Sequence, residues 1–207
     1  MRRVVCIARA DGAGGEEVAK LVADRLGFLY VDAEIVARAA IRGGLDPAVV
    51  ADAERRRSLV RRVLDAFAET GGSGWGGFAP AAATGEPSED DVQALIREAI
   101  TETMARGRVV IGGHAASHAL EPTTDCLRVF VTASRTTRTA RVAEAEHTDL
   151  AHAGRLIKDF DAGRADYLKR FYDISGELPT HYDLVVNTDT LSFEAAATLI
   201  SQAASEL

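Results

Sequence analysis

The sequence predicts an α/β protein with a five-stranded parallel sheet and helices on both faces. Short, mostly apolar runs alternate along the chain with longer amphipathic segments, which is the pattern of β-α-β units. These runs are too continuously apolar for a half-exposed sheet, so we expect the sheet to be buried on both sides. Ligands of such sheets bind beyond the carboxyl ends of the strands.

Length and composition point to one soluble domain over residues 1–207, with 47% apolar residues. The net charge of −7 disfavours nucleic acid and anionic membranes as partners, and no apolar run is long enough for a membrane span. The two cysteines, Cys6 and Cys126, form no Cys-x-x-Cys pair, which indicates a reducing, cytoplasmic location. The oligomeric state stays open, a homodimer included.

The first β-α-β unit is the clearest in the chain. An apolar strand is expected over 4–8, followed by a glycine-rich break over 11–15. A helix follows over 16–26, where apolar residues recur at helical spacing and Gly27 serves as the terminating glycine. A second strand covers 28–31 and ends at Asp32.

Further helices are expected over 33–41 and 46–69, before a loop over 71–87 that is rich in Gly, Ala and Pro and could act as a lid. Ser88 then caps a helix that ends at Gly107, with Asp91 at the capping-box position. The remaining strands are predicted at 109–111, 127–132 and 184–187, and the remaining helices at 134–146, 149–172 and 193–204.

The glycine loop has the composition of a phosphate-binding turn. Gly12, Ala13, Gly14 and Gly15 join a buried strand to a helix, where backbone N–H groups and the helix N-terminus favour an anion. A tight turn without a ligand is the alternative.

Two phosphate-binding motifs compete for this loop. A dinucleotide pattern would use Gly12 and Gly14 with Asp32 on the ribose, but Glu17 stands at its third position. A P-loop would use Gly14 as its second glycine. Gly15 then replaces the lysine, Glu16 the hydroxyl residue, and Arg9 the first glycine.

Further segments appear downstream in a fixed order. They are Val109 to Ala115 with Gly112-Gly113-His114, then Arg135-x-x-Arg138-x-x-Arg141, then Asp161-x-x-Arg164, and finally Tyr182 to Asp189. Together with the glycine loop they make the chain resemble the cytidylate kinase-like family, a branch of the P-loop nucleoside monophosphate kinases with a lysine-poor loop. The resemblance implies a three-layer P-loop NTPase-type fold, ATP and Mg²⁺ as cofactors, and transfer of a phosphoryl group to a nucleoside monophosphate such as CMP.

The resemblance also assigns roles to residues. Residues 33–90 would form the acceptor-binding insertion, and 134–172 would be lid-like helices. The donor site would comprise Arg9, Gly12, Ala13, Gly14, Gly15, Glu16 and Glu17, with Glu17 also toward magnesium. The acceptor would meet Asp32, His114, Asp161 and Arg164, and the transferred charge would face Arg135, Arg138, Arg141 and Arg164. Arginine suits these roles because its planar fork matches phosphate oxygens and keeps its charge.

Each assignment has a structural alternative. Arg138 and Arg141 could form a solvated helix face paired with Glu144 and Glu146, and Asp161 with Arg164 could be a helical ion pair. Asp32 could simply cap the next helix.

Tyr167 and Tyr172 are expected to be packing residues. His114 and His118, at i and i+4, could hold zinc, although a phosphate contact from His114 fits its place at a strand end better.

Three functions therefore stay open at the level of sequence. The first is a nucleoside monophosphate kinase. The second is a noncatalytic nucleotide-binding or regulatory protein of the same fold, suggested by Gly15, Glu16 and His114. The third is a dinucleotide-binding protein, suggested by Gly12, Gly14 and Asp32.

Overall fold

The computed structural model describes residues 3–32, 89–113, 115–119 and 125–206. The helices predicted over 33–41 and 46–69, the loop over 71–87 and the cap at Ser88 lie outside these residues.

The core of the protein is a parallel sheet of five strands in the order β2-β3-β1-β4-β5. This confirms the predicted fold class. All four neighbouring pairs are parallel, so every carboxyl end lies at the same edge of the sheet. The strands are β1 (Val4–Arg9), β2 (Leu29–Val31), β3 (Val109–Gly112), β4 (Cys126–Thr132) and β5 (Leu184–Asn187).

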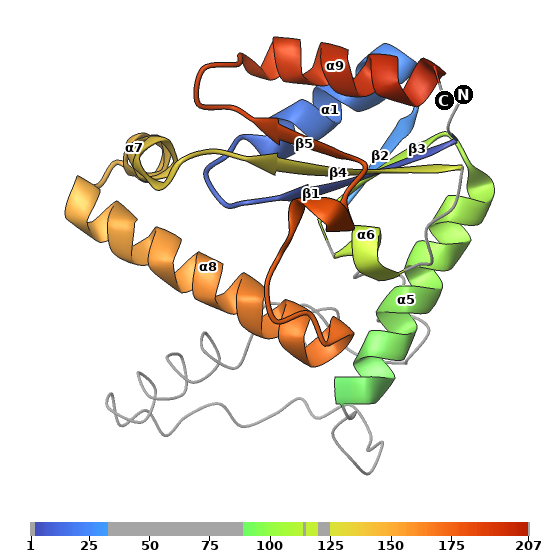
Figure 1. The fold of residues 1–207 in the computed structure, drawn as a ribbon, viewed down its shortest axis with the longest axis horizontal. Coiled ribbons are helices and arrows are strands. Elements are labelled where there is room, and N and C mark those ends of the chain that lie inside the picture. The colour runs from blue at the N-terminus through green and yellow to red at the C-terminus, as the bar shows by residue number, and fades with distance from the viewer. Residues whose placement is uncertain (1–2, 33–88, 114, 120–124, 207) are drawn as a thin grey trace, which may run out of the picture.

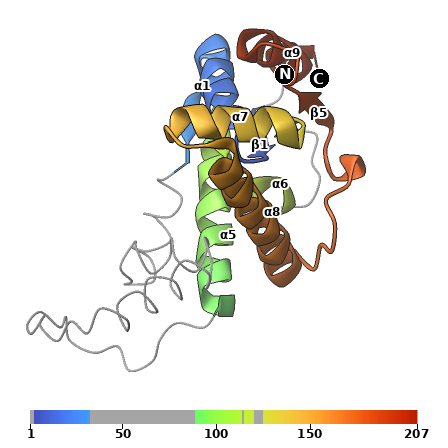
Figure 2. The ribbon, with the colours of Figure 1, turned by 90° about the vertical axis from the view of Figure 1, so that its left-hand side faces the viewer.

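Helices cover both faces of this sheet (Figure 1). On one face lie α1 (Gly15–Leu26) and α9 (Phe193–Glu206), and on the other lie α5 (Glu89–Arg106) and the short α6 (Ala116–Ala119). Two further helices, α7 (Arg135–Ala145) and α8 (Leu150–Tyr172), pack against each other. α7 lies beyond the carboxyl ends of β4 and β5, and α8 runs back beneath the sheet, as the second view also shows (Figure 2).

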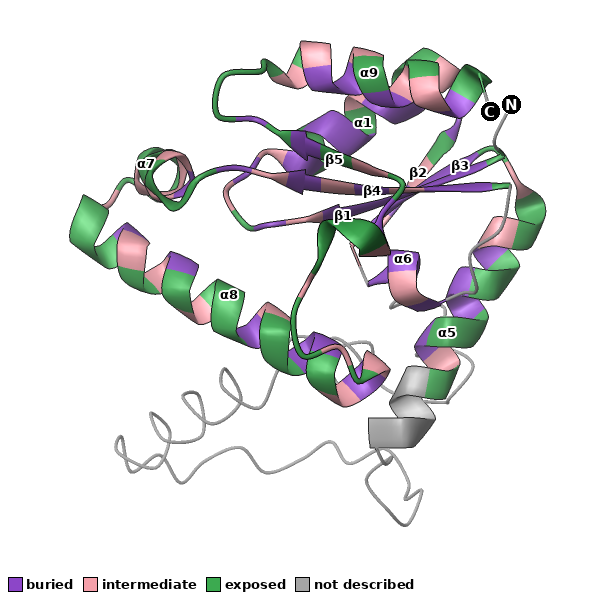
Figure 3. Ribbon diagram, viewed as in Figure 1, coloured by how far each residue is buried: buried purple, intermediate pink, exposed green. Residues whose placement is uncertain are grey.

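The burial pattern follows these layers (Figure 3). One apolar cluster joins the sheet to α1 and α9, and a second joins its other face to α5 and α6. Tyr167 belongs to a third cluster on α8 with Phe171, and Tyr172 packs partly buried beside it. Both tyrosines are therefore packing residues, as predicted.

Local signals in the sequence explain most of the element boundaries. Gly27 ends α1 in the left-handed conformation at φ 61°, as its position predicts. The Ser134 hydroxyl accepts from the Thr137 amide at the start of α7, and the Asp149 carboxylate accepts from the His152 amide at the start of α8. Two short elements were not predicted, α6 and a 3₁₀ turn at Pro179–His181, because neither is long enough to carry a periodic pattern.

The strand order argues against the dinucleotide-binding alternative. In a dinucleotide-binding half, the strand that follows the first helix lies beside the first strand. Here β1 pairs with β3 and β4, and β2 is separated from β1 by β3. Asp32 at the end of β2 therefore lies one strand further from the glycine loop than a ribose-binding acid would.

The two cysteines lie next to each other inside the sheet. Cys6 and Cys126 are both buried thiols that form no disulfide, with their sulfur atoms 3.5 Å apart. The hydrogen bond from Cys126 and burial raise the pKa of the Cys6 thiol well above its usual value. None of the described helices is long and apolar enough to cross a membrane.

Candidate functional site

Three successive carbonyl groups of the glycine loop accept hydrogen bonds from α7 and from the residue that follows β5. The Asp11 carbonyl accepts from Arg138 Nη1 at 3.2 Å, and the Gly12 carbonyl lies 3.5 Å from Arg141 Nη1. The Ala13 carbonyl accepts from the hydroxyl of buried Thr188 at 2.8 Å. Two residues of α7 and one residue after β5 thus fix the orientation of three successive peptide groups.

This fixes the direction of the amides as well. In a trans peptide, the carbonyl of one residue and the N–H of the next point in opposite directions, and the described chain has no cis peptide. The amides of Gly12 and Gly14 therefore point away from α7 and Thr188, whereas the Ala13 amide donates to the Ala10 carbonyl. No described group accepts from the amides of Gly12, Gly14 or Gly15, and the partial positive charge of the α1 N-terminus lies beside them.

Two of the glycines also have a structural reason. Gly12 (φ 78°) and Gly14 (φ 74°) adopt the left-handed conformation that favours glycine. A Cβ at Gly12 would come within 2.8 Å of the Arg138 carbonyl, and a Cβ at Gly14 would overlap the ring of Phe193. A tight turn accounts for these two glycines without a ligand, so the case for an anion site rests on the direction of the amides.

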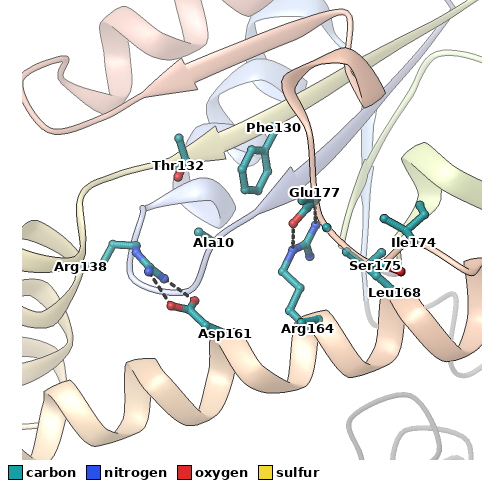
Figure 4. Close-up of a pocket in the computed structure, with 12 residues that line it drawn as sticks. Ala10, Phe130, Thr132, Arg138, Asp161, Arg164, Leu168, Ile174, Ser175 and Glu177 are labelled. Carbon is teal, nitrogen blue, oxygen red and sulfur yellow. Dashed lines mark hydrogen bonds and ion pairs between the residues drawn. The ribbon is translucent and has the colours of Figure 1, made fainter.

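A cavity of about 260 Å³ opens next to this loop, between the end of the sheet, α8 and the loop that follows α8. Two arginines point into it, and each is held by a carboxylate (Figure 4). Arg138 Nη1 and Nη2 donate to the two oxygens of Asp161 at 2.7 and 2.8 Å. Arg164 Nε and Nη2 donate to the two oxygens of Glu177 at 2.7 and 2.5 Å. The apolar part of the lining includes Ala10, Phe130, Leu168 and Ile174.

Arg164 is also part of a stack of rings. Its guanidinium lies 5.5 Å from the centre of the Phe130 ring, which stacks on Tyr182 at 5.1 Å. The Tyr182 hydroxyl bonds to Glu177 and lies 3.1 Å from His118 Nε2. Burial lowers the pKa of His118 to about 4, so this imidazole is neutral at pH 7.

Both structural alternatives given for these arginines are wrong. Asp161 does not pair with Arg164, because it faces α7 and holds Arg138, while Arg164 turns to the loop after α8 and holds Glu177. Arg138 and Arg141 do not form a solvated face paired with Glu144 and Glu146. Arg138 is only 7% exposed, and Arg141 donates to the hydroxyl and carbonyl of Thr188 at 3.0 and 2.7 Å.

The other predicted site residues are spread around this core. Arg135 is exposed and donates to the Gly154 carbonyl at 3.3 Å, which joins α7 to α8. Asp32 accepts from Arg9 at 3.2 Å and from the Tyr30 hydroxyl at 3.0 Å. Its predicted cap on the next helix falls outside the described residues.

The acids on the first turn of α1 point to solvent. Glu16 pairs with Lys20 at 2.7 Å, and Glu17 is exposed. Among the described residues, no group of three or more His, Cys, Asp or Glu side chains could hold a metal ion. His114 lies outside the described residues, and with it both its predicted phosphate contact and the zinc alternative. His118 Nε2 lies 3.1 Å from the Tyr182 hydroxyl.

Several residues of this site were not singled out from the sequence, among them Thr188, Glu177, Phe193 and Phe130. Thr188 could have been found, since a polar residue directly after a predicted strand lies at the edge of the sheet where the glycine loop lies. Glu177 and Phe193 carry no such signal, because both stand outside any motif, and tertiary packing alone brings them to the site.

Two shikimate kinases and an uncharacterized protein are among the solved structures that share the fold of this chain. A shikimate kinase from Bacteroides thetaiotaomicron aligns with 99% of this chain and 98% of its own, at 17% identity and a TM-score of 0.53. A shikimate kinase from Acinetobacter baumannii in complex with shikimate aligns with 100% of this chain and 94% of its own, at 13% identity and a TM-score of 0.52. An uncharacterized protein from Eubacterium ventriosum aligns over 100% of both chains, at 17% identity and a TM-score of 0.69.

The chain therefore has the three-layer α/β fold of the P-loop kinases. The model of the cytidylate kinase-like family matches residues 4–190, and the chain belongs to this family. None of the curated proteins matches the chain.

The packing of the glycine loop can be tested by stability. We expect Gly14→Ala to lower the free energy of unfolding by about 2–5 kcal/mol, because it adds backbone strain and a clash with Phe193. Gly27→Ala is the matched control, since Gly27 is also left-handed but a Cβ there meets only Arg108 Nη2 at 3.5 Å. Urea unfolding of both variants checks this. Equal losses would contradict the contact with Phe193.

The neutral state of His118 predicts a pH dependence. Because the pKa of His118 is lowered from 6.5 to about 4 on folding, the unfolded chain takes up this proton first as the pH falls. The free energy of unfolding should therefore decline between about pH 6.5 and 4. We expect His118→Gln to reduce this decline in urea unfolding at pH 7 and pH 5. An unchanged difference between the two pH values would show that His118 is not kept neutral.

Proposed function

We propose that this protein transfers the γ-phosphoryl group of ATP to a nucleoside monophosphate such as CMP, in the cytoplasm. The observation that carries the proposal is the direction of the Gly12 and Gly14 amides, which point away from the bonded carbonyls next to the α1 N-terminus. Membership of the cytidylate kinase-like family and a kinase fold support the same reaction. Two buried cysteines that form no disulfide agree with a reducing compartment.

In this proposal the glycine loop holds the donor phosphates and the arginine-lined cavity receives the acceptor. Phosphoryl transfer asks the protein for positioning and for stabilisation of negative charge rather than covalent chemistry. The Arg138 guanidinium lines the cavity and also bonds the loop at Asp11, so it connects the two places. Arg164 would bind the acceptor phosphate, with Phe130 beneath its guanidinium.

Most ligands of a magnesium ion in this site would come from the phosphates of the nucleotide. Mg²⁺ in kinases is held by one or two carboxylates together with phosphate oxygens. Glu17 fits this role, since its carboxylate is exposed on the first turn of α1, beside the loop. The ion would offset the repulsion between Glu17 and a polyphosphate.

A noncatalytic nucleotide-binding protein is the second candidate. It is favoured by Gly15 in place of the P-loop lysine and by the Arg164–Glu177 pair, which occupies the arginine expected to bind the acceptor. Such a protein would bind nucleotide at the same loop but transfer no phosphate.

A panel of nucleotides separates the two candidates. We expect ATP with magnesium to raise the melting temperature while NAD(P) does not, because the loop and the strand order suit a polyphosphate and not a dinucleotide. Coupled ADP release should then be detected with at least one nucleoside monophosphate. If the protein binds ATP but releases ADP with none of the nucleoside monophosphates, the kinase proposal is overturned and the noncatalytic one remains.

The Glu177 carboxylate should compete with the acceptor. An incoming phosphate competes with Glu177 for Arg164, so Glu177→Gln should lower the KM for the acceptor several-fold with little change in the KM for ATP. Steady-state kinetics of this variant provide the test. Glu144→Gln, an exposed acid on α7, is the control for the loss of one negative charge. A raised acceptor KM in Glu177→Gln would mean that Glu177 helps to bind the substrate.

A further inference from the structure

The Arg9 side chain explains why the P-loop lysine is missing. Gly15 stands at the lysine position, yet its φ does not lie in the left-handed region, so the backbone does not require glycine there. A Cβ at Gly15 would overlap Cβ of Arg9 and lie 3.1 Å from its Cδ. The stem of Arg9 thus lies over the start of α1, where a lysine stem would begin.

The guanidinium of Arg9 lies over the end of β3. A Cβ at Gly113 would come within 3.2 Å of Arg9 Nη1, and a Cβ at Gly112 would come within 2.8 Å of the Tyr30 hydroxyl. Glycines at 15, 112 and 113 therefore all make room for one cluster, in which Arg9 and Tyr30 bond to Asp32. Burial and the nearby Asp32 carboxylate raise the pKa of Tyr30, which keeps its hydroxyl a donor to that carboxylate.

This cluster leaves part of the guanidinium unused. Asp32 takes one hydrogen bond from Arg9, through Nη2 at 3.2 Å. Nη1 is buried and has no hydrogen-bond partner among the described residues, although the side chain as a whole is 25% exposed. An arginine fork with one arm on a carboxylate and the other unoccupied can still bind an anion.

We infer that Arg9 is the phosphate-contacting cation of this site, and that cation and glycine have exchanged places relative to a lysine-containing P-loop. Such a loop has glycine at the position of Arg9 and lysine at that of Gly15, and this chain has the reverse. Arg9 then meets a phosphate of the nucleoside triphosphate at the edge where β1, β2 and β3 end, next to the amides of the loop. The inference rests on the proposed binding of ATP, not on the identity of the acceptor.

The exchange can be reversed by mutation. In the variant Arg9→Gly/Gly15→Lys, a cation stands at the start of α1, as in a lysine-containing P-loop. In the control Arg9→Gly/Gly15→Ala, the Arg9 side chain is removed in the same way, but no cation replaces it. We expect the Arg9→Gly/Gly15→Ala variant to bind ATP with magnesium at least tenfold more weakly than the wild type in calorimetric titrations. The Arg9→Gly/Gly15→Lys variant should recover most of this loss. Urea unfolding of each variant confirms that it is folded, and Gly15→Ala alone should be destabilised by its clash with Arg9.

A purely structural role for Arg9 would give other results. If Arg9 only neutralises Asp32, adding Asp32→Asn to Arg9→Gly/Gly15→Ala would restore ATP binding, which would overturn the inference. ATP affinity of the Arg9→Gly/Gly15→Ala variant within twofold of the wild type would also overturn it. If the wild type binds ATP but transfers phosphate to no acceptor, the proposed kinase activity fails while these affinities still decide the role of Arg9. A wild type that binds no ATP would refute both.

Discussion

The fixed direction of three peptide groups, held by Arg138, Arg141 and Thr188, is the constraint on which the site depends. Each of these donors comes from a part of the chain distant in sequence, and each takes up a carbonyl of the glycine loop. Satisfying the carbonyls from one side leaves the amides to face the other side, at the start of α1. The loop is therefore arranged for an anion before any ligand arrives, so less reorganisation is needed on binding.

Three of the cations of the site are paired with carboxylates. Arg138 is held by Asp161, Arg164 by Glu177 and Arg9 by Asp32. These pairs remove the repulsion that a cluster of unpaired guanidinium groups would cause in the empty site. They also mean that a phosphate group binds by exchange, because it must replace a carboxylate or share a guanidinium with it. An acid at the rim of the site can in this way set the affinity for the substrate.

The sequence was a good guide to the fold because its signals are local. Each of these signals depends only on residues a few positions away. Examples are the apolar strands, Gly27 at the end of α1, and the caps at Ser134 and Asp149. Partners in the site are set by tertiary packing instead. Asp161 and Arg164 lie within one turn of α8, yet they do not pair with each other. Asp161 pairs with Arg138 on α7, and Arg164 pairs with Glu177 in the loop after α8. Likewise, nothing in the sequence around Gly14 predicts that the Phe193 ring leaves no room for a side chain there.

The arrangement of the glycine loop is best tested by following its backbone amides by NMR during a titration with ATP and magnesium. We expect the amide resonances of Gly12, Gly14 and Gly15 to shift in a saturable manner, and the Ala13 amide, already bonded to Ala10, to shift less. ATP that binds with these three resonances unmoved would contradict this arrangement, because the nucleotide would then lie elsewhere on the protein.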